Sequence, residues 1–230
     1  MRRAFILIIL LVFSRLLVLG VKNTEEVTLL TVSHTDNGLI GGTANLYVKI
    51  TPGSGRIYID TYPLSRLDTI ESIRIANKEA CRYSPVDCKN YDFYYNIKTS
   101  SPLVGGPSAG GFIAITTLAM LYGLDVKDEV SMSGTVTSGG VIGPVEGLKE
   151  KAIAAMNHGK NIVLVPKLAL LYWDNNTNTS KLNETLINSF KRVKIVPIGN
   201  IIEGLEVATS KNISIKELTK NEEYENRMYK

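Results

Sequence analysis

The most informative stretch of this 230-residue chain is Val104-Gly105-Gly106-Pro107-Ser108-Ala109-Gly110-Gly111. Its four glycines free the backbone for positive φ angles and for close approach to a ligand. Ser108 stands where the loop is expected to become a helix, so the N–H groups of Ser108 and Ala109 would lack intrahelical acceptors. Such donors suit an anion, either a phosphate or the oxyanion of an acyl-transfer intermediate. The alternative is a serine that only caps the helix between two tight turns.

Outward from this loop, strand patterns and helix patterns alternate along the chain. Strands are expected at Glu26–His34, Thr43–Ile50, Arg56–Thr61, Tyr91–Lys98, Glu129–Thr137, Val141–Val145, Ile162–Val165 and Val193–Val196. The first three strands should form an antiparallel meander. Thr99–Pro107 should be a loop, whose extended segment Thr99–Val104 could pair with substrate as an added strand. Helices are expected at Ser108–Tyr122, Gly147–Asn157, Leu182–Phe190 and Ile201–Thr209, with another, capped by Ser65, that carries Leu67, Ile70, Ile73 and Ala80 on one stripe. The alternation predicts one α/β (α+β) domain.

A serine nucleophile needs a base, and the residues alone leave the choice of base open. His158 is explained as part of a helix end, whereas His34 lies in a polar stretch near the start of the chain. Lysine can serve as the base where burial lowers its pKa toward neutrality. Lys149 and Lys151 lie on opposite borders of the apolar stripe of one predicted helix, and periodicity does not choose between them. The alternative for each is a lysine that reaches solvent at the surface.

Composition excludes several classes of function. The chain has 26 Lys+Arg and 22 Asp+Glu, a formal charge of +4, and no basic cluster larger than a pair, so nucleic acid is not an expected partner. Two histidines and two cysteines are too few for a His/Cys zinc site. The glycine-rich loop is not a Walker A motif, because no Gly-Lys-Ser/Thr ends it. We expect neither a metal nor another cofactor.

The first segment predicts export. Arg2 and Arg3 precede an apolar run from Ala4 to Val21, interrupted by Arg15, which is close to the shortest length that spans a bilayer. The pattern favours an uncleaved transmembrane anchor over a cleaved signal peptide, with the rest of the chain outside the cytoplasm. We therefore expect a single-pass membrane protein, with secretion after cleavage as the alternative.

The two cysteines of the chain, Cys81 and Cys88, agree with export. In an oxidising compartment a bond between them would close a short loop and contribute roughly 2–3 kcal/mol. The alternative is a pair of reduced thiols in the core. Because disulfides are rare in the cytosol, a bond here would accompany an extracytoplasmic domain.

Four motifs together resemble the proteolytic domain of Lon proteases: Gly106-Pro107-Ser108-Ala109-Gly110, Met132-Ser133-Gly134, Gly147-Leu148-Lys149-Glu150-Lys151 and Val163-Leu164-Val165-Pro166. The resemblance covers roughly residues 30–210. It implies that Ser108 is the nucleophile and that the lysine 43 residues later, Lys151, is its partner. It also implies that Ser133 places a hydroxyl against the lysine amine. The backbone donors of Ser108 and Ala109 would hold the oxyanion.

The chain departs from the family pattern at three places. Gly105 and Gly106 stand where an acidic residue usually precedes Gly-Pro-Ser, and Thr135 replaces the acidic residue that follows Met-Thr-Gly. Pro144-Val145-Glu146-Gly147 replaces Pro-Ile-Gly-Gly. These departures concern substrate gating and activation, whereas the residues that correspond to the dyad are kept.

The resemblance implies a stand-alone serine endopeptidase with a Ser/Lys dyad. Residues 1–22 would be the signal or anchor, residues 23–210 the proteolytic domain and residues 211–230 a charged tail. Because these residues hold no Walker motif, we expect ATP-independent cleavage of unfolded proteins or peptides, and by resemblance a homo-oligomer such as a six-membered ring. Two alternatives are a phosphate- or nucleotide-binding protein of the GHMP-kinase fold and an inactive membrane-tethered scaffold.

Overall fold

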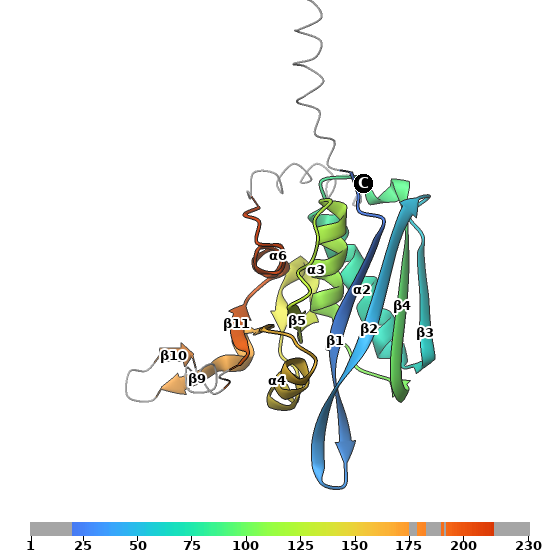
Figure 1. Ribbon diagram of the computed structural model, residues 1–230. Helices are drawn as coiled ribbons and strands as arrows, with labels where there is room; N and C mark the ends of the chain where they lie inside the picture. Colours follow the sequence, from blue (N-terminus) through green and yellow to red (C-terminus); the bar gives the residue numbers. More distant parts are fainter. Residues whose placement is uncertain (1–19, 175–178, 183–189, 191, 214–230) are drawn as a thin grey trace, which may run out of the picture.

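The computed structural model describes residues 20–174, 179–182, 190 and 192–213 (Figure 1). The strands are β1 (Thr24–Thr35), β2 (Gly38–Pro52), β3 (Ile57–Ser65), β4 (Tyr91–Val104), β5 (Val130–Met132), β6 (Thr135–Val136), β7 (Ile142–Gly143), β8 (Ile162–Pro166), β9 (Leu171–Asp174), β10 (Thr179–Leu182) and β11 (Lys194–Ile198). The helices are α2 (Leu67–Arg82), α3 (Gly110–Leu121), α4 (Leu148–Asn157) and α6 (Ile201–Thr209). The chain is therefore the mixed α/β protein that the alternating patterns predict.

A four-stranded sheet in the order β1-β2-β4-β3 forms one layer (Figure 1). β1 and β2 are an antiparallel hairpin, as the expected meander requires, but the other neighbour of β2 is β4, to which it is antiparallel, and not β3. The expected meander is wrong for β3, which pairs parallel to β4 at the edge of the sheet. The reason is that α2 connects β3 to β4, and a crossover helix brings the chain back to begin the next strand in the same direction.

A smaller parallel sheet in the order β11-β8-β5 forms the other layer. Its middle strand, β8, is buried over nearly its whole length, as expected for a parallel strand covered on both faces. The chain reaches β8 from β5 through the short β6–β7 hairpin and α4, so α4 is the crossover of this sheet.

Helix α3 lies between the two layers (Figure 1). All twelve of its residues are buried, which explains why its sequence is apolar nearly all round. The helix packs against α2, against α6 and against the inner face of the large sheet. A Cβ on Gly204 of α6 would lie 2.3 Å from Cδ1 of Ile115, so this glycine is what allows α6 to approach α3.

Two predicted helix starts are wrong. Helix α2 begins at Leu67, with Arg66 rather than Ser65 as its N-cap, because Ser65 still pairs with Val104 in the sheet. Leu67 does not belong to the buried stripe, since 83% of it is exposed. Helix α3 begins at Gly110, so Ser108 is not its N-cap but lies in the turn before it.

Other boundaries differ by a few residues. The predicted loop Thr99–Pro107 is strand as far as Val104, and the long strand predicted at Glu129–Thr137 is divided into β5 and β6 around Gly134. The β9–β10 hairpin was not predicted. Most of the helix predicted at Leu182–Phe190 lies outside the described residues.

The predicted N-terminal anchor lies almost wholly outside the described residues, as does most of the charged tail. Within the part of the chain that the structure describes, no helix combines the length and apolarity needed to cross a membrane.

Candidate active site

The loop that contains Ser108 is held against the end of β5. The carbonyl oxygen of Ser108 accepts a hydrogen bond of 2.8 Å from the N–H of Gly134, and the N–H of Gly111 returns one of 2.8 Å to the carbonyl of Gly134. A third bond, from Gly110 N–H to the carbonyl of Pro107, closes the turn at 3.0 Å. Ser108 itself is only partly buried, so these backbone bonds hold a residue that solvent still reaches.

Two backbone donors at the start of α3 are available for a ligand. Among the described residues, the N–H groups of Ser108 and Ala109 have no hydrogen-bond acceptor, whereas those of Gly110 and Gly111 are both bonded. Ala109 has right-handed helical dihedral angles and is the N-cap of α3. Free N–H groups beside a helix N-terminus attract negative charge. Ser108 and Ala109 therefore have the unpaired backbone donors that the sequence predicts at this position.

The close approach of the loop to β5 depends on glycine. A Cβ on Gly111 would lie 2.9 Å from the carbonyl oxygen of Gly134 and 2.5 Å from Cε of Met132. Both distances are shorter than ordinary contacts, so a side chain at Gly111 would push the loop away from β5. The glycine that follows Pro-Ser-Ala-Gly thus has a packing role in addition to its backbone freedom.

Ser133 directly precedes Gly134 and is fully buried. Its N–H donates to the carbonyl of Leu164 in β8 at 3.1 Å, but its Oγ has no hydrogen-bond partner among the described residues. A buried hydroxyl without a partner is costly in a folded protein. The structure therefore brings Ser133 beside the backbone of Ser108 and leaves its hydroxyl unpaired at the end of β5.

Lys151 is the buried lysine of α4. Only 2% of its surface is exposed, whereas Lys149, two residues earlier, is exposed. Burial lowers the pKa of Lys151 to about 8, and the negative charge of Glu146 partly opposes this effect. Helix α4 is held close to β2, because a Cβ on Gly41 would lie 2.0 Å from the carbonyl oxygen of Glu150. At a pH near 8 the amine of Lys151 is half neutral and can accept a proton.

Neither histidine is hydrogen-bonded to Ser108, and within the described residues Lys151 is not hydrogen-bonded to it either. His34, near the end of β1, is exposed, and its Nε2 lies 3.5 Å from a carboxylate oxygen of Glu146. The Nδ1 of His158 lies 2.9 Å from the carbonyl oxygen of Ala154, one turn earlier at the end of the same helix. These contacts account for the position of each histidine, and we assign neither of them the role of base.

Sequence reasoning missed two sets of residues around the site. One is Glu146, whose charge acts on Lys151 from the turn before α4. The other is a group of polar residues on the first two turns of α2 that hydrogen-bond the Ser108 loop: Asp68, Thr69 and Ser72. Their spacing places them on one helix face, but nothing in the sequence indicates which loop that face meets.

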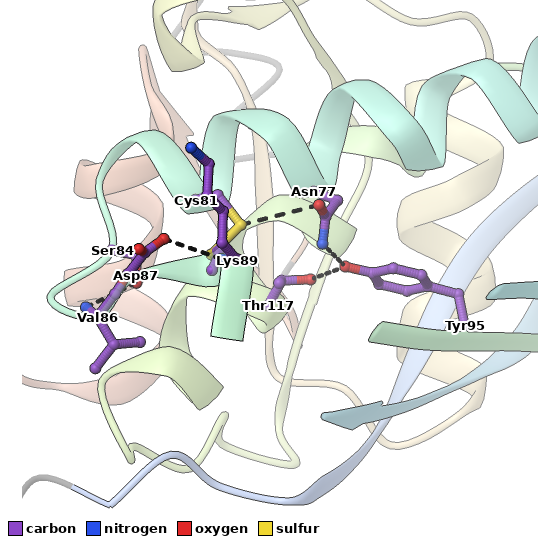
Figure 2. Close-up of a disulfide and its surroundings, with 9 residues drawn as sticks. Asn77, Cys81, Ser84, Val86, Asp87, Lys89, Tyr95 and Thr117 are labelled. Atoms are coloured by element: carbon purple, nitrogen blue, oxygen red, sulfur yellow. Dashed lines mark hydrogen bonds between the residues drawn. A yellow bond between two sulfur atoms is a disulfide. The ribbon is translucent and has the colours of Figure 1, made fainter. Parts of the chain in front are cut away.

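Cys81 and Cys88 are joined by a disulfide at the end of α2, with their Cα atoms 5.9 Å apart (Figure 2). Beside it, a buried polar chain leads toward α3. Asn77 donates to the hydroxyl of Tyr95 at 2.9 Å, and that hydroxyl lies 3.0 Å from Oγ1 of Thr117 in α3. Burial raises the pKa of Tyr95 to about 12, so the hydroxyl keeps its proton. The disulfide ties the end of α2 to the start of β4, and the polar chain links α2 through Tyr95 of β4 to α3, both away from the Ser108 loop.

No cluster of three or more His, Cys, Asp or Glu residues suited to a metal occurs within the described ranges. The groups that the sequence analysis names for this site are the hydroxyls of Ser108 and Ser133, the amine of Lys151 and the backbone N–H groups of Ser108 and Ala109. They can perform acid–base and nucleophilic chemistry.

Comparison with known proteins gives one consistent family. Residues 69–210 match the model of the Lon protease (S16) C-terminal proteolytic domain. The chain is 26% identical over 177 residues to Lon protease of Paraburkholderia phytofirmans, covering 72% of this chain and 21% of that protein. It is 35% identical over 106 residues to Lon protease of Trichlorobacter lovleyi, covering 46% of this chain and 12% of that protein.

A third relative, Lon protease 1 of Bacillus subtilis, is 30% identical over 132 residues. This alignment covers 55% of the chain and 17% of the Bacillus protein. The chain thus spans about a fifth or less of the length of the curated relatives it matches.

Proposed function

Because the chain belongs to the Lon protease (S16) proteolytic-domain family, a family of Ser/Lys dyad peptidases, we propose that it is a serine endopeptidase with Ser108 as nucleophile and Lys151 as general base. The observation that carries this assignment is the burial of Lys151, which lowers its pKa to about 8. An ordinary lysine, with a pKa of about 10.4, is almost wholly charged at neutral pH and cannot accept a proton.

In the proposed reaction, the neutral amine of Lys151 takes the proton of the Ser108 hydroxyl as Oγ attacks a peptide carbonyl. The protonated lysine then gives this proton to the leaving amine, and an ester joins the acyl group to Ser108. The same lysine next activates a water molecule, which attacks the ester and releases the second product. The unpaired hydroxyl of Ser133 is the group we propose to orient the lysine.

Negative charge on the carbonyl oxygen is the largest electrostatic demand of this reaction. We assign it to the N–H groups of Ser108 and Ala109, which have no acceptor among the described residues. Donors that are fixed before the reaction stabilise an oxyanion better than water does, because they need no reorganisation.

We propose extended polypeptide as the substrate. β2 leaves β4 after the pair Asn45–Lys98, while β3 follows β4 as far as the pair Ser65–Val104. β4 therefore continues as an extended strand toward the loop of Ser108, past its last residue pair with β2. A peptide in strand conformation could pair with this part of β4 and lead its scissile bond to the nucleophile.

The proposal includes two further parts, independence of ATP and action outside the cytoplasm. The proposed chemistry needs no nucleotide, since serine, lysine and backbone groups supply every step. The disulfide between Cys81 and Cys88 and the apolar run that begins at Ala4 support an oxidising compartment. In protein from its native host, both cysteines should react with a thiol reagent only after reduction; free thiols would contradict this location.

We also propose a homo-oligomer, which light scattering would test.

The function is tested by peptide hydrolysis together with a serine-directed acylating probe. The wild-type protein should cleave a fluorogenic peptide with and without ATP, and mass spectrometry should find the probe on Ser108. Ser108→Ala should abolish both hydrolysis and labelling. Ser54→Ala, in an exposed turn distant from Ser108 in the sequence, should keep both. Absence of hydrolysis and of labelling in the wild-type protein would exclude the peptidase.

A further inference from the structure

The loop before Ser108 contains two glycines, Gly105 and Gly106, which have no side chains that could hold its conformation. Gly106 adopts a φ of +93°, and a Cβ there would meet nothing within 4 Å. A backbone with this freedom does not hold one conformation by itself. Because Ser108 is two residues away, whatever fixes Gly106 also fixes the nucleophile.

Helix α2 supplies that support through three side chains. A carboxylate oxygen of Asp68, Oδ1, accepts a hydrogen bond of 3.2 Å from the N–H of Gly106. Thr69 donates to the carbonyl of Gly106 at 3.4 Å, and Ser72 donates to the carbonyl of Pro107 at 3.1 Å. Both polar groups of the Gly106 backbone, together with the next carbonyl, are therefore held by one face of α2.

Asp68 is itself fixed from the other side. Its second oxygen, Oδ2, forms an ion pair of 3.2 Å with Nη2 of Arg66, the N-cap of α2. The stem of Arg66 lies against the loop, since a Cβ on Gly105 would be 2.6 Å from Cδ of Arg66. The carboxylate also lies in the first turn of the helix, where a negative charge is favourable.

We propose that Asp68 is a positioning residue for the nucleophile, an inference that rests on the proposed peptidase function. The loop is bound on one side by Gly134, which hydrogen-bonds the carbonyl of Ser108, and on the other by Asp68, which hydrogen-bonds Gly106. These two hydrogen bonds fix the orientation of the Ser108 hydroxyl and of the N–H groups of Ser108 and Ala109. Asp68 touches neither substrate nor reacting atoms and acts through the backbone.

Among the three side chains, Asp68 is the one to test. Its bond to Gly106 involves a charged acceptor, and such bonds are about twice as strong as neutral ones. Ser72 is 7% exposed and Thr69 is 3% exposed, so removing either would also disturb the core of α2. The side chain of Asp68 is 36% exposed, which leaves room for substitution without a buried cavity.

The experiment compares Asp68→Ala and Asp68→Asn with Asp87→Ala. Asp87 is a matched control, because its Oδ1 likewise accepts a backbone N–H bond, from Lys89 at 3.0 Å, but as the N-cap of the short 3-10 helix Cys88–Asn90 that follows α2. Asp68→Ala should lower kcat and the rate of Ser108 acylation about tenfold, with little change in KM and in the pH midpoint that Lys151 sets. Asp68→Asn keeps the acceptor oxygen and should recover most of the loss. Asp87→Ala should resemble the wild type.

Hydrogen–deuterium exchange gives a readout that does not depend on activity. The Gly106 amide should exchange at least about tenfold faster in Asp68→Ala than in the wild type, and close to the wild-type rate in Asp68→Asn. An unchanged kcat in Asp68→Ala, beside an inactive Ser108→Ala, would overturn the positioning role and leave the peptidase intact. Even if the wild type proved not to be a peptidase, an unchanged exchange rate of the Gly106 amide in Asp68→Ala would overturn the role of Asp68 in holding the loop. If Asp68→Ala failed to fold, the test would rest on Asp68→Asn. A kcat well below that of the wild type, with the Gly106 amide exchanging at the wild-type rate, would then overturn the positioning role.

Discussion

Lys151 and Lys149 lie two residues apart in α4, yet only Lys151 is removed from solvent. We predict that Lys151→Ala lowers peptide hydrolysis to background, because no other group would take the proton of Ser108. Lys151→Arg should fail as well, since a guanidinium does not lose its proton near neutral pH. Lys149→Ala is the matched control and should keep most of the activity. Steady-state hydrolysis of a fluorogenic peptide measures all three, and equal losses at Lys149 and Lys151 would contradict the assignment.

The pH dependence follows from the direction of the shift at Lys151. The base works in its neutral form, so kcat/KM should rise with pH and level off above the pKa of about 8. Glu146 raises the pKa of this lysine, so Glu146→Gln should move the midpoint of the rise to lower pH. Glu150→Gln, on the same helix, is the control that should leave the midpoint in place. A rate that does not change between pH 6 and 9 would exclude a lysine base.

At this scale the sequence yields the candidate site residues but not their surroundings. The motif spacing points to Lys151 rather than Lys149, and the structure adds an observation that periodicity lacks: Lys151 is buried, whereas Lys149 is exposed. The effect of Glu146 could not be predicted, because it depends on how the turn before α4 folds back toward the lysine.

Helix α2 is an element with a different function at each end. Its first turns hold the Ser108 loop, and its last turn is tied to the start of β4 by the disulfide between Cys81 and Cys88 (Figure 2). A bond across seven residues should stabilise the fold by roughly 2–3 kcal/mol through the lost freedom of the unfolded chain. We predict that reduction lowers the free energy of unfolding by that amount, which urea denaturation would register as a lower midpoint. The double variant Cys81→Ser/Cys88→Ser should match the reduced protein and not respond to reductant. Equal midpoints for oxidised and reduced protein would refute the prediction.

The elements were predictable where one periodicity runs without interruption. β1, α4 and α6 appear close to their predicted bounds, because their apolar residues recur with a single period, whereas β2 begins five residues before its predicted start, in a stretch that does not alternate. The start of α3 was misplaced by two residues, since Ser108 has the chemistry of an N-cap but its carbonyl is bound by Gly134 instead. The pairing of β3 escaped prediction for another reason: alternation indicates a strand but not its neighbour.

In the whole molecule, α3 is the shared core between the two sheets, and it brings distant parts of the chain together around Ser108 (Figure 1). The four motifs indicated one fold before any contact was known, because their combination is specific to one family. What they could not supply is the set of contacts across the layers. Asp68 and Gly106 are far apart in the sequence, and only the packing of α2 against α3 makes them neighbours.

The last prediction concerns what the whole molecule can cleave. The proposed site receives a substrate as an extended strand along β4, and a peptide bond inside a stable domain is not available in that form. We therefore predict that reduced, alkylated casein is degraded, that a stable folded domain is not, and that neither ATP nor magnesium changes the rate. Gel electrophoresis over a time course measures this, with Ser108→Ala as the control for a contaminating protease. Equal digestion of the folded and unfolded proteins would refute the requirement for an extended substrate. Stimulation by ATP would instead show that a nucleotide-driven partner takes part.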